Sequence, residues 1–475
     1  MGKMGLARVH VSGRLFSFGA SIGKEVTGRI NPTLQVVVLA VVGVASVARA
    51  DNAWTLTDAH FADQRVHLVS IDDNGIRVDS APEPDAQSHA MAMQDREYLR
   101  NPPPLPEVET NTILWTQVLG LDRLGPVHAL FSHTDGILID ALPDEPMVIY
   151  LNGGDHLAGT LQGVSDDQVA WHSECEGITL KIPEDRVNAI ARKGVVVDSL
   201  DQQRDKDTVR LSNGDQVSGI FQGVSGGDVA IQPANADSPM QIPLANVQAV
   251  LLADTDPRQL PPHRLFRLTF ADGSTFSFDT LHVSDEEDAQ AVPSASRESV
   301  SFYFGTVKRI EQMGGPVQWL TTLSPQVEYR PFLDESFPPQ FEHTVADPAT
   351  PLSVHYAAFH HGIGVHSYTK LTYAIPPGYT AFRTQYAIDP IPGLESTKAD
   401  MTLRLLLDGT VKWEQTHVRS GVAGEPAQID LGNAKSLALE ADYGDNVAAQ
   451  DRLTWLDPAF IRTDAVSPQT QPAPP

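Results

Sequence analysis

The sequence predicts an all-β protein in which tandem small β-barrels or meanders precede a larger β-sandwich. Short alternating apolar runs are separated by turn signals, and Gly 35 and Pro 35 among 475 residues favour sheets over helix bundles. A segment that begins at Leu151 returns sixty residues later at Leu211, which indicates repeated small units. The C-terminal third alternates over longer strands, as expected of two packed sheets.

Residues 1–50 have the features of a secretory signal peptide. Basic residues precede an apolar run from Leu34 to Val47, and Ala48-Arg49-Ala50 follows as a small-x-small cleavage site. We therefore expect a mature chain that begins at Asp51 and is secreted or periplasmic, with no stable membrane insertion after cleavage. An uncleaved anchor is the alternative, although 14 apolar residues are short for a bilayer span.

The mature chain is strongly acidic. Without residues 1–50, which hold six basic residues and one acidic residue, it has 28 basic and 59 acidic side chains, a net charge of −31. This charge excludes general electrostatic binding of nucleic acid or anionic lipid. Cys175 is the only cysteine, which excludes an intramolecular disulfide, and its apolar neighbours predict a buried, inert thiol.

Two copies of the repeat, residues 147–192 and 207–252, align without gaps. Seven of fourteen aligned positions around the first hairpin are identical. The alignment predicts two equivalent pairs, Asp155 with Asp215 in the hairpin turn and Leu161 with Phe221 in the core. Alternating runs between permissive turn residues predict four or five strands in each copy, as in a small meander or SH3-like barrel.

Two further copies are weaker. A third covers residues 264–312, and a degenerate fourth covers residues 51–100. Residues 101–146 are interpreted as a Pro-rich linker with strands, and residues 463–475 as a disordered tail.

Residues 316–462 form a separate C-terminal module. Apolar and polar side chains alternate from Met401 to Leu407, Asp408-Gly409 supplies a turn, and Val411 begins the returning strand. This hairpin and similar alternation elsewhere in the module predict a β-sandwich.

Two motifs bracket most of the module. They are His360-His361-Gly362-Ile363-Gly364-Val365-His366-Ser367 and Asp451-Arg452-Leu453-Thr454-Trp455-Leu456-Asp457. In these motifs the module resembles the NPCBM/NEW family, the carbohydrate-binding modules first noted beside glycosyl hydrolase family 98 enzymes. The resemblance implies a galactose-binding-like jelly roll that binds a terminal sugar. Thr454 departs from the family pattern, which has an acidic residue there, and this puts any contact of that carboxylate in doubt.

The candidate sugar-binding residues are His366, Tyr368, Tyr386 and Trp455. Aromatic rings stack on the apolar face of a pyranose, and imidazole exchanges hydrogen bonds with hydroxyls. No cofactor is required, but the resemblance implies that a structural calcium could be held by Asp389, Asp451 and Asp457. The alternatives remain open: Trp455 could be a core residue, and His366 a buried histidine bonded to backbone.

The leading hypothesis is a secreted, non-catalytic carbohydrate-binding protein, with the repeats as a spacer or as a docking surface for a protein partner. One alternative is a structural or adhesion protein that uses the repeats for protein contact. Another is a glycoside hydrolase with its catalytic part in residues 51–310. Gly223-Val224-Ser225-Gly226-Gly227 matches a nucleophile elbow, but it lies between short strands and not in a strand–turn–helix, so we reject it.

Overall fold

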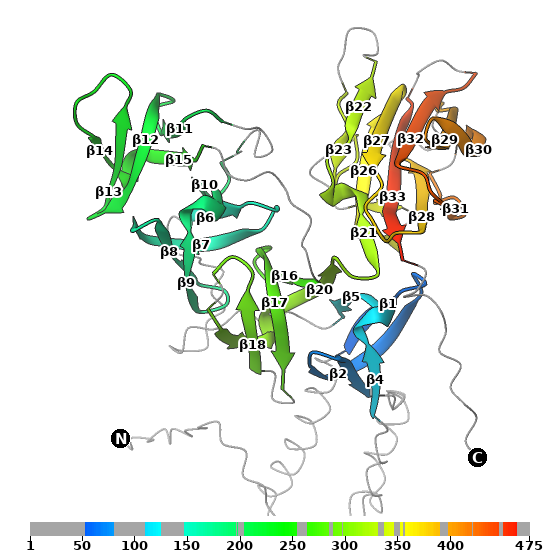
Figure 1. Cartoon of the computed structure of the whole chain (residues 1–475), viewed down its shortest axis with the longest axis horizontal. Coiled ribbons are helices and arrows are strands. Elements are labelled where there is room, and N and C mark those ends of the chain that lie inside the picture. Colours follow the sequence, from blue (N-terminus) through cyan, green and yellow to red (C-terminus); the bar gives the residue numbers. More distant parts are fainter. Residues whose placement is uncertain are drawn as a thin grey trace, which may run out of the picture. The chain divides into compact units, whose positions relative to one another are not determined.

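The computed structural model is all-β (Figure 1). It describes residues 53–79, 110–124, 147–195, 197, 204–253, 264–284, 288–296, 298–330, 337–345, 352–354, 357–389, 398–419, 421–445 and 450–462. The predicted signal peptide, the predicted tail and most of residues 101–146 lie outside the described residues. In the part of the chain that the structure describes, no helix is long and apolar enough to cross a membrane.

Each of four N-terminal units is an antiparallel meander that closes on itself. In unit 2 a 3-10 turn, η2 (Glu184–Arg186), precedes the last strand, which pairs back with the first. The strands of unit 2 are β6 (Met147–Leu151), β7 (His156–Ser165), β8 (Gln168–Ser173), β9 (Ile178–Pro183) and β10 (Val187–Arg192). Closure leaves few free strand edges in a unit of this size.

Units 3 and 4 repeat this topology. Unit 3 consists of β11 (Asp207–Leu211), β12 (Gln216–Ser225), β13 (Asp228–Pro233), β14 (Met240–Pro243), η3 (Leu244–Asn246) and β15 (Val247–Leu251). Unit 4 consists of β16 (Leu265–Phe270), β17 (Thr275–Val283), β18 (Asp288–Pro293), β19 (Val300–Tyr303), η4 (Phe304–Thr306) and β20 (Val307–Met313). In each unit the last strand pairs with the first, as β15 does with β11 and β20 with β16.

Unit 1 extends beyond its predicted boundary. Its strands are β1 (Ala53–Asp58), β2 (Asp63–Ile71), β3 (Gly75–Asp79), β4 (Thr110–Leu114) and, after η1 (Trp115–Gln117), β5 (Val118–Arg123). Residues 101–146 were predicted as a Pro-rich linker with strands, and two of its strands, β4 and β5, belong to this barrel, because β4 pairs with β3 and β5 with β1. Residues 80–109 separate β3 from β4 along the chain. A meander tolerates a long connection because the entropic cost of loop closure grows slowly with loop length.

Equivalent residues fill equivalent places in units 2 and 3. Leu161 and Phe221 are 8% and 6% exposed, and both point into the shared apolar core. Asp155 and Asp215 each follow a glycine with φ near +90° in the first hairpin turn, a conformation that favours glycine.

The units associate in two pairs of the same kind. In units 2 and 3, β10 runs antiparallel to β15, and Ile190 lies opposite Val250, its own equivalent sixty residues on. In units 1 and 4, β5 runs antiparallel to β20, and Leu121 lies opposite Ile310. These two residues occupy the positions in their strands that Ile190 and Val250 occupy in β10 and β15. Because each central residue faces its own equivalent, both pairs have a local twofold arrangement.

Two arginines at the ends of equivalent strands make matching bonds across the pairs. Arg192 donates from Nε to the carbonyl of Val247 and from Nη2 to that of Leu244, at 2.8 and 3.1 Å. Arg123 makes the same two bonds around η4, at 2.9 and 3.1 Å. Each guanidinium therefore bonds the first carbonyl of a 3-10 turn and the carbonyl of the residue that follows the turn, both in the neighbouring unit.

The C-terminal module is a sandwich of two antiparallel sheets around one apolar core. The first sheet contains β21 (Val317–Trp319), β23 (Gln340–Phe341), β26 (Gly362–His366), β28 (Ala381–Ile388), β31 (Ala427–Asp430) and β33 (Arg452–Ile461). The second contains β22 (Gln326–Tyr329), β27 (Thr369–Ala374), β29 (Met401–Leu407), β30 (Thr410–Val418) and β32 (Ser436–Tyr443). A further 3-10 turn, η5 (Leu320–Thr322), and a short ribbon of β24 (Ser353–Val354) and β25 (Ala357–Ala358) complete it.

The module contacts unit 1 through an apolar cluster that includes Leu119 and Trp319. Phe61 lies in the first hairpin turn of unit 1 with φ 63°, where the other units have glycine. Its ring meets Trp319 edge-on at 6.0 Å and lies under the guanidinium of Arg383 at 4.1 Å. The side chain thus gains contacts with the module in exchange for an unfavourable backbone conformation.

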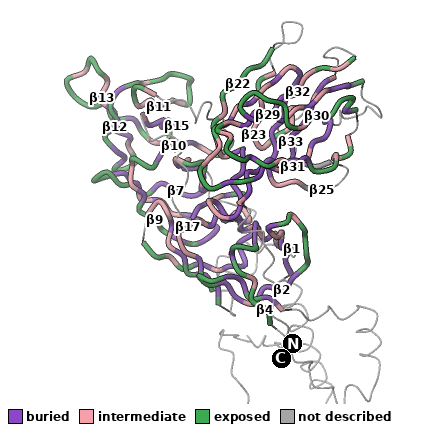
Figure 2. Tube along the Cα trace, turned by 45° about the vertical axis from the view of Figure 1, so that its right-hand side comes forward, coloured by how far each residue is buried: buried purple, intermediate pink, exposed green. Residues whose placement is uncertain are grey.

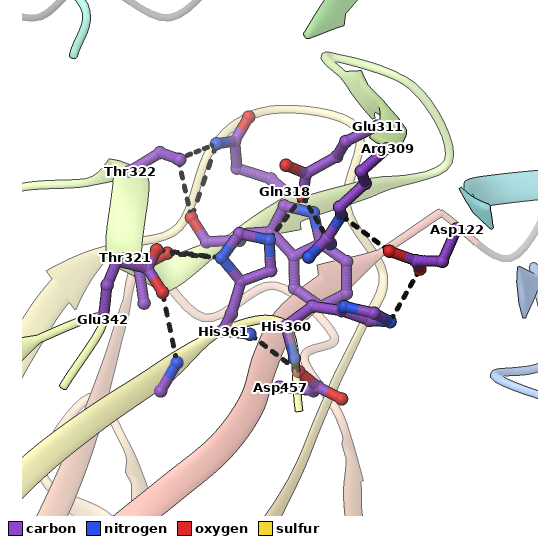
Figure 3. A network of polar contacts seen from close by, with 12 residues as sticks. Asp122, Arg309, Glu311, Gln318, Thr321, Thr322, Glu342, His360, His361 and Asp457 are labelled. Atoms are coloured by element: carbon purple, nitrogen blue, oxygen red, sulfur yellow. Dashed lines mark hydrogen bonds and ion pairs between the residues drawn. The ribbon is translucent and has the colours of Figure 1, made fainter. Parts of the chain in front are cut away.

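A buried polar network lies at the same contact (Figure 3). The imidazole of His361 lies between the carboxylates of Glu311 and Glu342 and stacks on Trp319 at 4.4 Å. Burial alone would lower the pKa of His361, but the two carboxylates raise it to about 10. His360 reaches Asp122 of unit 1 at 3.3 Å. The two histidines that open the first motif therefore join the module to the repeats.

Candidate functional site

Several of the predicted residues lie at the end of the sandwich opposite the contact with unit 1. His366 ends β26, Asp389 follows β28, and Asp451 precedes β33. The register of the first sheet pairs His366 with Arg452 and Ile388 with Leu453, so these three positions lie at one end of neighbouring strands.

Asp451 is fully buried and holds two segments together. Its carboxylate accepts hydrogen bonds from Ser367 Oγ at 2.8 Å and from the backbone N–H of Asp400 at 3.2 Å. Burial raises the pKa of Asp451 to about 6, and the nearby charge of Asp400 adds to the effect. The geometry gives Asp451 a bracing role.

Asp389 and His366 are also satisfied by the protein itself. Asp389 accepts hydrogen bonds from the backbone N–H of Val345 at 3.2 Å and from the hydroxyl of Thr454. Thr454, the departure from the family pattern, thus bonds a neighbouring carboxylate. His366 Nδ1 contacts the carbonyl of Ser367 at 2.7 Å, the ring stacks on Phe337 at 4.9 Å, and burial lowers its pKa.

Tyr368 is half-buried on the outer side of the second sheet. The guanidinium of Arg330 lies over its ring at 4.6 Å, and its hydroxyl donates to Glu440 at 3.4 Å. One face of this ring is therefore already covered by the protein.

Two of the predicted rings lie in the core. Trp455 is 1% exposed and Tyr386 8%, and the two pack against each other in a T-shape at 6.4 Å. Neither offers a ring face to solvent, which corrects their prediction as stacking platforms. The physical reason is their register: Tyr386 lies opposite Trp455 on adjacent strands, and both rings face the second sheet.

The three predicted calcium ligands do not gather. Asp457 accepts hydrogen bonds from the backbone N–H groups of His360 and His361, at 3.2 and 3.0 Å, in the buried polar network at the contact with the repeats. It lies six positions after Asp451 along an extended strand, roughly 20 Å away at about 3.3 Å per residue. Calcium takes about six to eight oxygen ligands, and these carboxylates are separately bonded to protein donors, so they do not fit one ion.

A second set of residues at the same end was not predicted from the sequence. We call it the Asp400 cluster: Asp400, His417, Arg419 and Asp445. The carboxylate of Asp400 accepts from Arg419 Nη2 at 2.7 Å and contacts His417 Nδ1 at 3.2 Å. The bond from Arg419 holds the pKa of Asp400 below its ordinary value, although burial works against it. Asp400 is sealed beneath two partners that are each 56% exposed.

The cluster presents polar groups to solvent from a rigid base. The strand register puts Tyr443 and Val418 on either side of Met401, so the exposed ring of Tyr443 lies beside the cluster. Asp400, His417 and Asp445 come close enough to share a cation, but the guanidinium of Arg419 already occupies Asp400. An exposed guanidinium, imidazole, carboxylate and aromatic ring are the groups that bind sugar hydroxyls and the apolar face of a pyranose. No motif marks them, because they come from the ends of three separate strands.

The family comparison identifies the C-terminal module. Residues 318–461 match the model of the NPCBM/NEW2 domain, so this third of the chain is an NPCBM/NEW2 domain. No curated protein matches the chain.

Among solved structures, the chain is similar to the CBM51-2 and INT domains of ZmpB from Clostridium perfringens, in complex with GlcNAc. The identity is 19%, the match covers 38% of this chain and 37% of that one, and the TM-score is 0.28. It is also similar to CBM51 of GH95 from Clostridium perfringens in complex with methyl-galactose, at 14% identity, 30% and 99% coverage and a TM-score of 0.26. The chain thus spans little more than a third of the first structure.

Proposed function

We propose that the chain is an extracytoplasmic, non-catalytic protein whose C-terminal module binds a terminal sugar at the Asp400 cluster. The observation that supports this most is the exposed pair of Arg419 and His417 on a buried carboxylate, within a domain of a carbohydrate-binding family. The four N-terminal units serve as a spacer or docking surface.

The chemistry of the cluster suits a sugar. Arg419 and His417 are fixed by Asp400, so little side-chain entropy is lost when they donate to hydroxyls. Asp445 offers an exposed acceptor, and Tyr443, 41% exposed, offers a plane for the C–H face of a pyranose. Asp451 supports the site from beneath, because its carboxylate accepts a hydrogen bond from the backbone N–H of Asp400.

The test uses the mature chain on a glycan array, followed by calorimetry with the sugars found and with GlcNAc and methyl-galactose. We expect a dissociation constant in the micromolar to millimolar range, about 4–8 kcal/mol. Arg419→Ala should weaken binding about tenfold or more, because it removes charged hydrogen bonds. Lys412→Ala removes another exposed cation, on β30, and should bind as the unaltered chain does.

Failure to bind any glycan contradicts the proposed function. Unchanged affinity in Arg419→Ala would instead place the sugar elsewhere on the module. A structural calcium held by residues other than Asp389, Asp451 and Asp457 remains a proposal, which an EDTA-induced fall in melting temperature would support. The non-catalytic role predicts that polysaccharides incubated with the chain release no sugar.

A further inference from the structure

The first hairpin turn of each unit forms a face that is used differently in the four units. We call it the turn face and define it in unit 2 by residues 153–158, in unit 3 by residues 213–218 and in unit 4 by residues 272–277. In units 2 and 4 the two turn faces meet, and His156 lies opposite Thr275. These two residues occupy equivalent positions in their units. His156 lies eight positions before Val164, which pairs with unit 3, and Thr275 lies eight positions before Val283, which pairs with unit 1.

The contact between units 2 and 4 is built around Asp155. Its carboxylate accepts hydrogen bonds from the backbone N–H and the hydroxyl of Ser277, both at 2.9 Å, and from Arg267 Nε at 3.1 Å. In the opposite direction, Ser274 Oγ accepts from the backbone N–H of Ala158 at 2.9 Å. Ser274 is the equivalent of Asp155 and Ala158 that of Ser277, so the contact repeats itself about a local twofold axis.

The contacts arrange the units in space in the order 3, 2, 4, 1. Units 3 and 2 join through β10 and β15, units 2 and 4 through their turn faces, and units 4 and 1 through β5 and β20. At the unit 1 end, the equivalent turn is covered by the C-terminal module, because Phe61 packs on Trp319 and Arg383.

The turn face of unit 3 is exposed. Asp155, Ser274 and Ser277 are between 2% and 6% exposed where units 2 and 4 meet. Their unit 3 equivalents Asp215 and Ser218 are both exposed. Figure 2 shows loops of this unit near β11 and β13 in the colour of exposed residues.

Unit 3 carries both halves of the contact. Asp215 is the equivalent of Asp155, the acceptor, and Ser218 is the equivalent of Ser277, the donor. Ser218 lies opposite Thr208 in the register in which Ser277 lies opposite Arg267, so the two serines are oriented alike on their strands. A face that carries a donor and its acceptor at twofold-related positions is complementary to itself.

An exposed apolar residue supports the same conclusion. Met240 of β14 is 47% exposed, while its equivalents on β9 and β19, Leu180 and Val300, are 1% exposed and half-buried. Strands β9 and β19 approach each other where units 2 and 4 meet. If the turn face of unit 3 met another turn face in the way those of units 2 and 4 meet, β14 and its Met240 would be covered.

We propose that the turn face of unit 3 binds the same face of a second copy of this chain, forming a twofold dimer. Gln216 of each copy lies opposite its counterpart on the axis, as His156 lies opposite Thr275. The carboxylate of Asp215 in each copy accepts hydrogen bonds from the backbone N–H and the hydroxyl of Ser218 in the other copy. Such a dimer repeats the contact already made between units 2 and 4.

Sedimentation velocity of the mature chain over a range of concentrations tests this proposal. We expect a monomer–dimer equilibrium. Gln216→Glu keeps the side-chain shape but sets two carboxylates against each other on the axis, and Ser218→Glu sets a carboxylate against Asp215 of the other copy. Each should raise the dimer dissociation constant at least about tenfold, because like charges at an interface repel strongly.

The double variant Asp215→Lys with Ser218→Glu provides the rescue. It restores an acceptor and a donor across the axis, so it should dimerise again where Ser218→Glu does not. Asp430→Ala, which removes an exposed carboxylate on β31, is the matched control and should behave as the unaltered chain. A chain that stays monomeric at high concentration overturns the proposal, as does a dimer that both single variants leave intact. Sugar binding is measured separately and is independent of either result.

Discussion

Glu176 is a buried carboxyl group beside the contact of units 2 and 4. It is 2% exposed, accepts a hydrogen bond from Ser173 Oγ and lies close to Asp272 and the buried Cys175. Burial raises the pKa of Glu176 to about 8, and the charge of Asp272 adds to the effect. Burial also raises the pKa of Cys175. The buried surroundings therefore favour the protonated forms of Glu176 and Cys175.

The prediction for Glu176 concerns pH. Its folded-state pKa lies above its unfolded value, so the native state holds the proton more tightly and stability falls as pH rises from about 4.5 to 8. Glu176→Gln should remove this fall and raise the free energy of unfolding near pH 8 by about 2–4 kcal/mol. Chemical denaturation at several pH values measures it, with exposed Glu174→Gln as the control. Parallel pH curves for Glu176→Gln and the unaltered chain would contradict the prediction.

At the same scale, the sequence named His366 as a candidate sugar-binding residue and Asp389 and Asp451 as candidate calcium ligands, and the structure brings all three to one end of neighbouring strands. Their exposure could not be predicted, because it depends on which loops cover those ends. Trp455 was misjudged as a sugar platform for a related reason: alternation shows that a ring faces one side, but only the packed second sheet shows that the side is closed. Arg419 and His417 lacked any local signal.

At the scale of elements, His361 ties β26 to β20 and η5. Its raised pKa means that the protonated form is favoured in the fold, so its contribution is fully present below pH 6.5 and is lost as pH rises through about 10. His361→Gln would leave the buried Glu311 without this positive charge, which should cost about 3–5 kcal/mol.

Thermal unfolding from pH 7 to pH 10.5 checks this prediction. The unaltered chain should lose stability towards the alkaline end, and His361→Gln should start lower and show a flatter profile. His60→Gln changes an exposed histidine in unit 1 and serves as the control. Equal melting temperatures for His361→Gln and the control would rule out this role.

The elements themselves differ in how far the sequence predicts them. Units 2 and 3 are evident because seven of fourteen hairpin positions are identical. Unit 1 was cut short because its β3 and β4 are separated by residues 80–109, and a Pro-rich stretch resembles a boundary. The closing strand of that barrel could be assigned only from its pairing with β1.

At the scale of the whole molecule, the association of the units could not be predicted from the repeat. Equivalent strands have equivalent surfaces, so sequence similarity does not tell whether a unit prefers its chain neighbour or a more distant one. The choice rests on particular side chains, such as Arg123 at η4 and Phe61 beneath the module.

The order of the units in space, 3, 2, 4, 1, differs from their order along the chain, and this affects when each can become stable. Arg192 and Val247 are 55 residues apart, whereas Arg123 and Val307 are 184 apart. Contacts between distant residues form more slowly, because a longer loop must close first. In pulsed hydrogen exchange during refolding, amides of β6 to β15 should gain protection before those of β1 to β5.

Simultaneous protection of all four units would contradict this sequence of events. During synthesis, unit 1 is made before unit 4, its partner, and before the module that covers its turn. Unit 1, although made before the other three units, is therefore among the last parts to be completed, and its unpaired strands are open to aggregation during that interval.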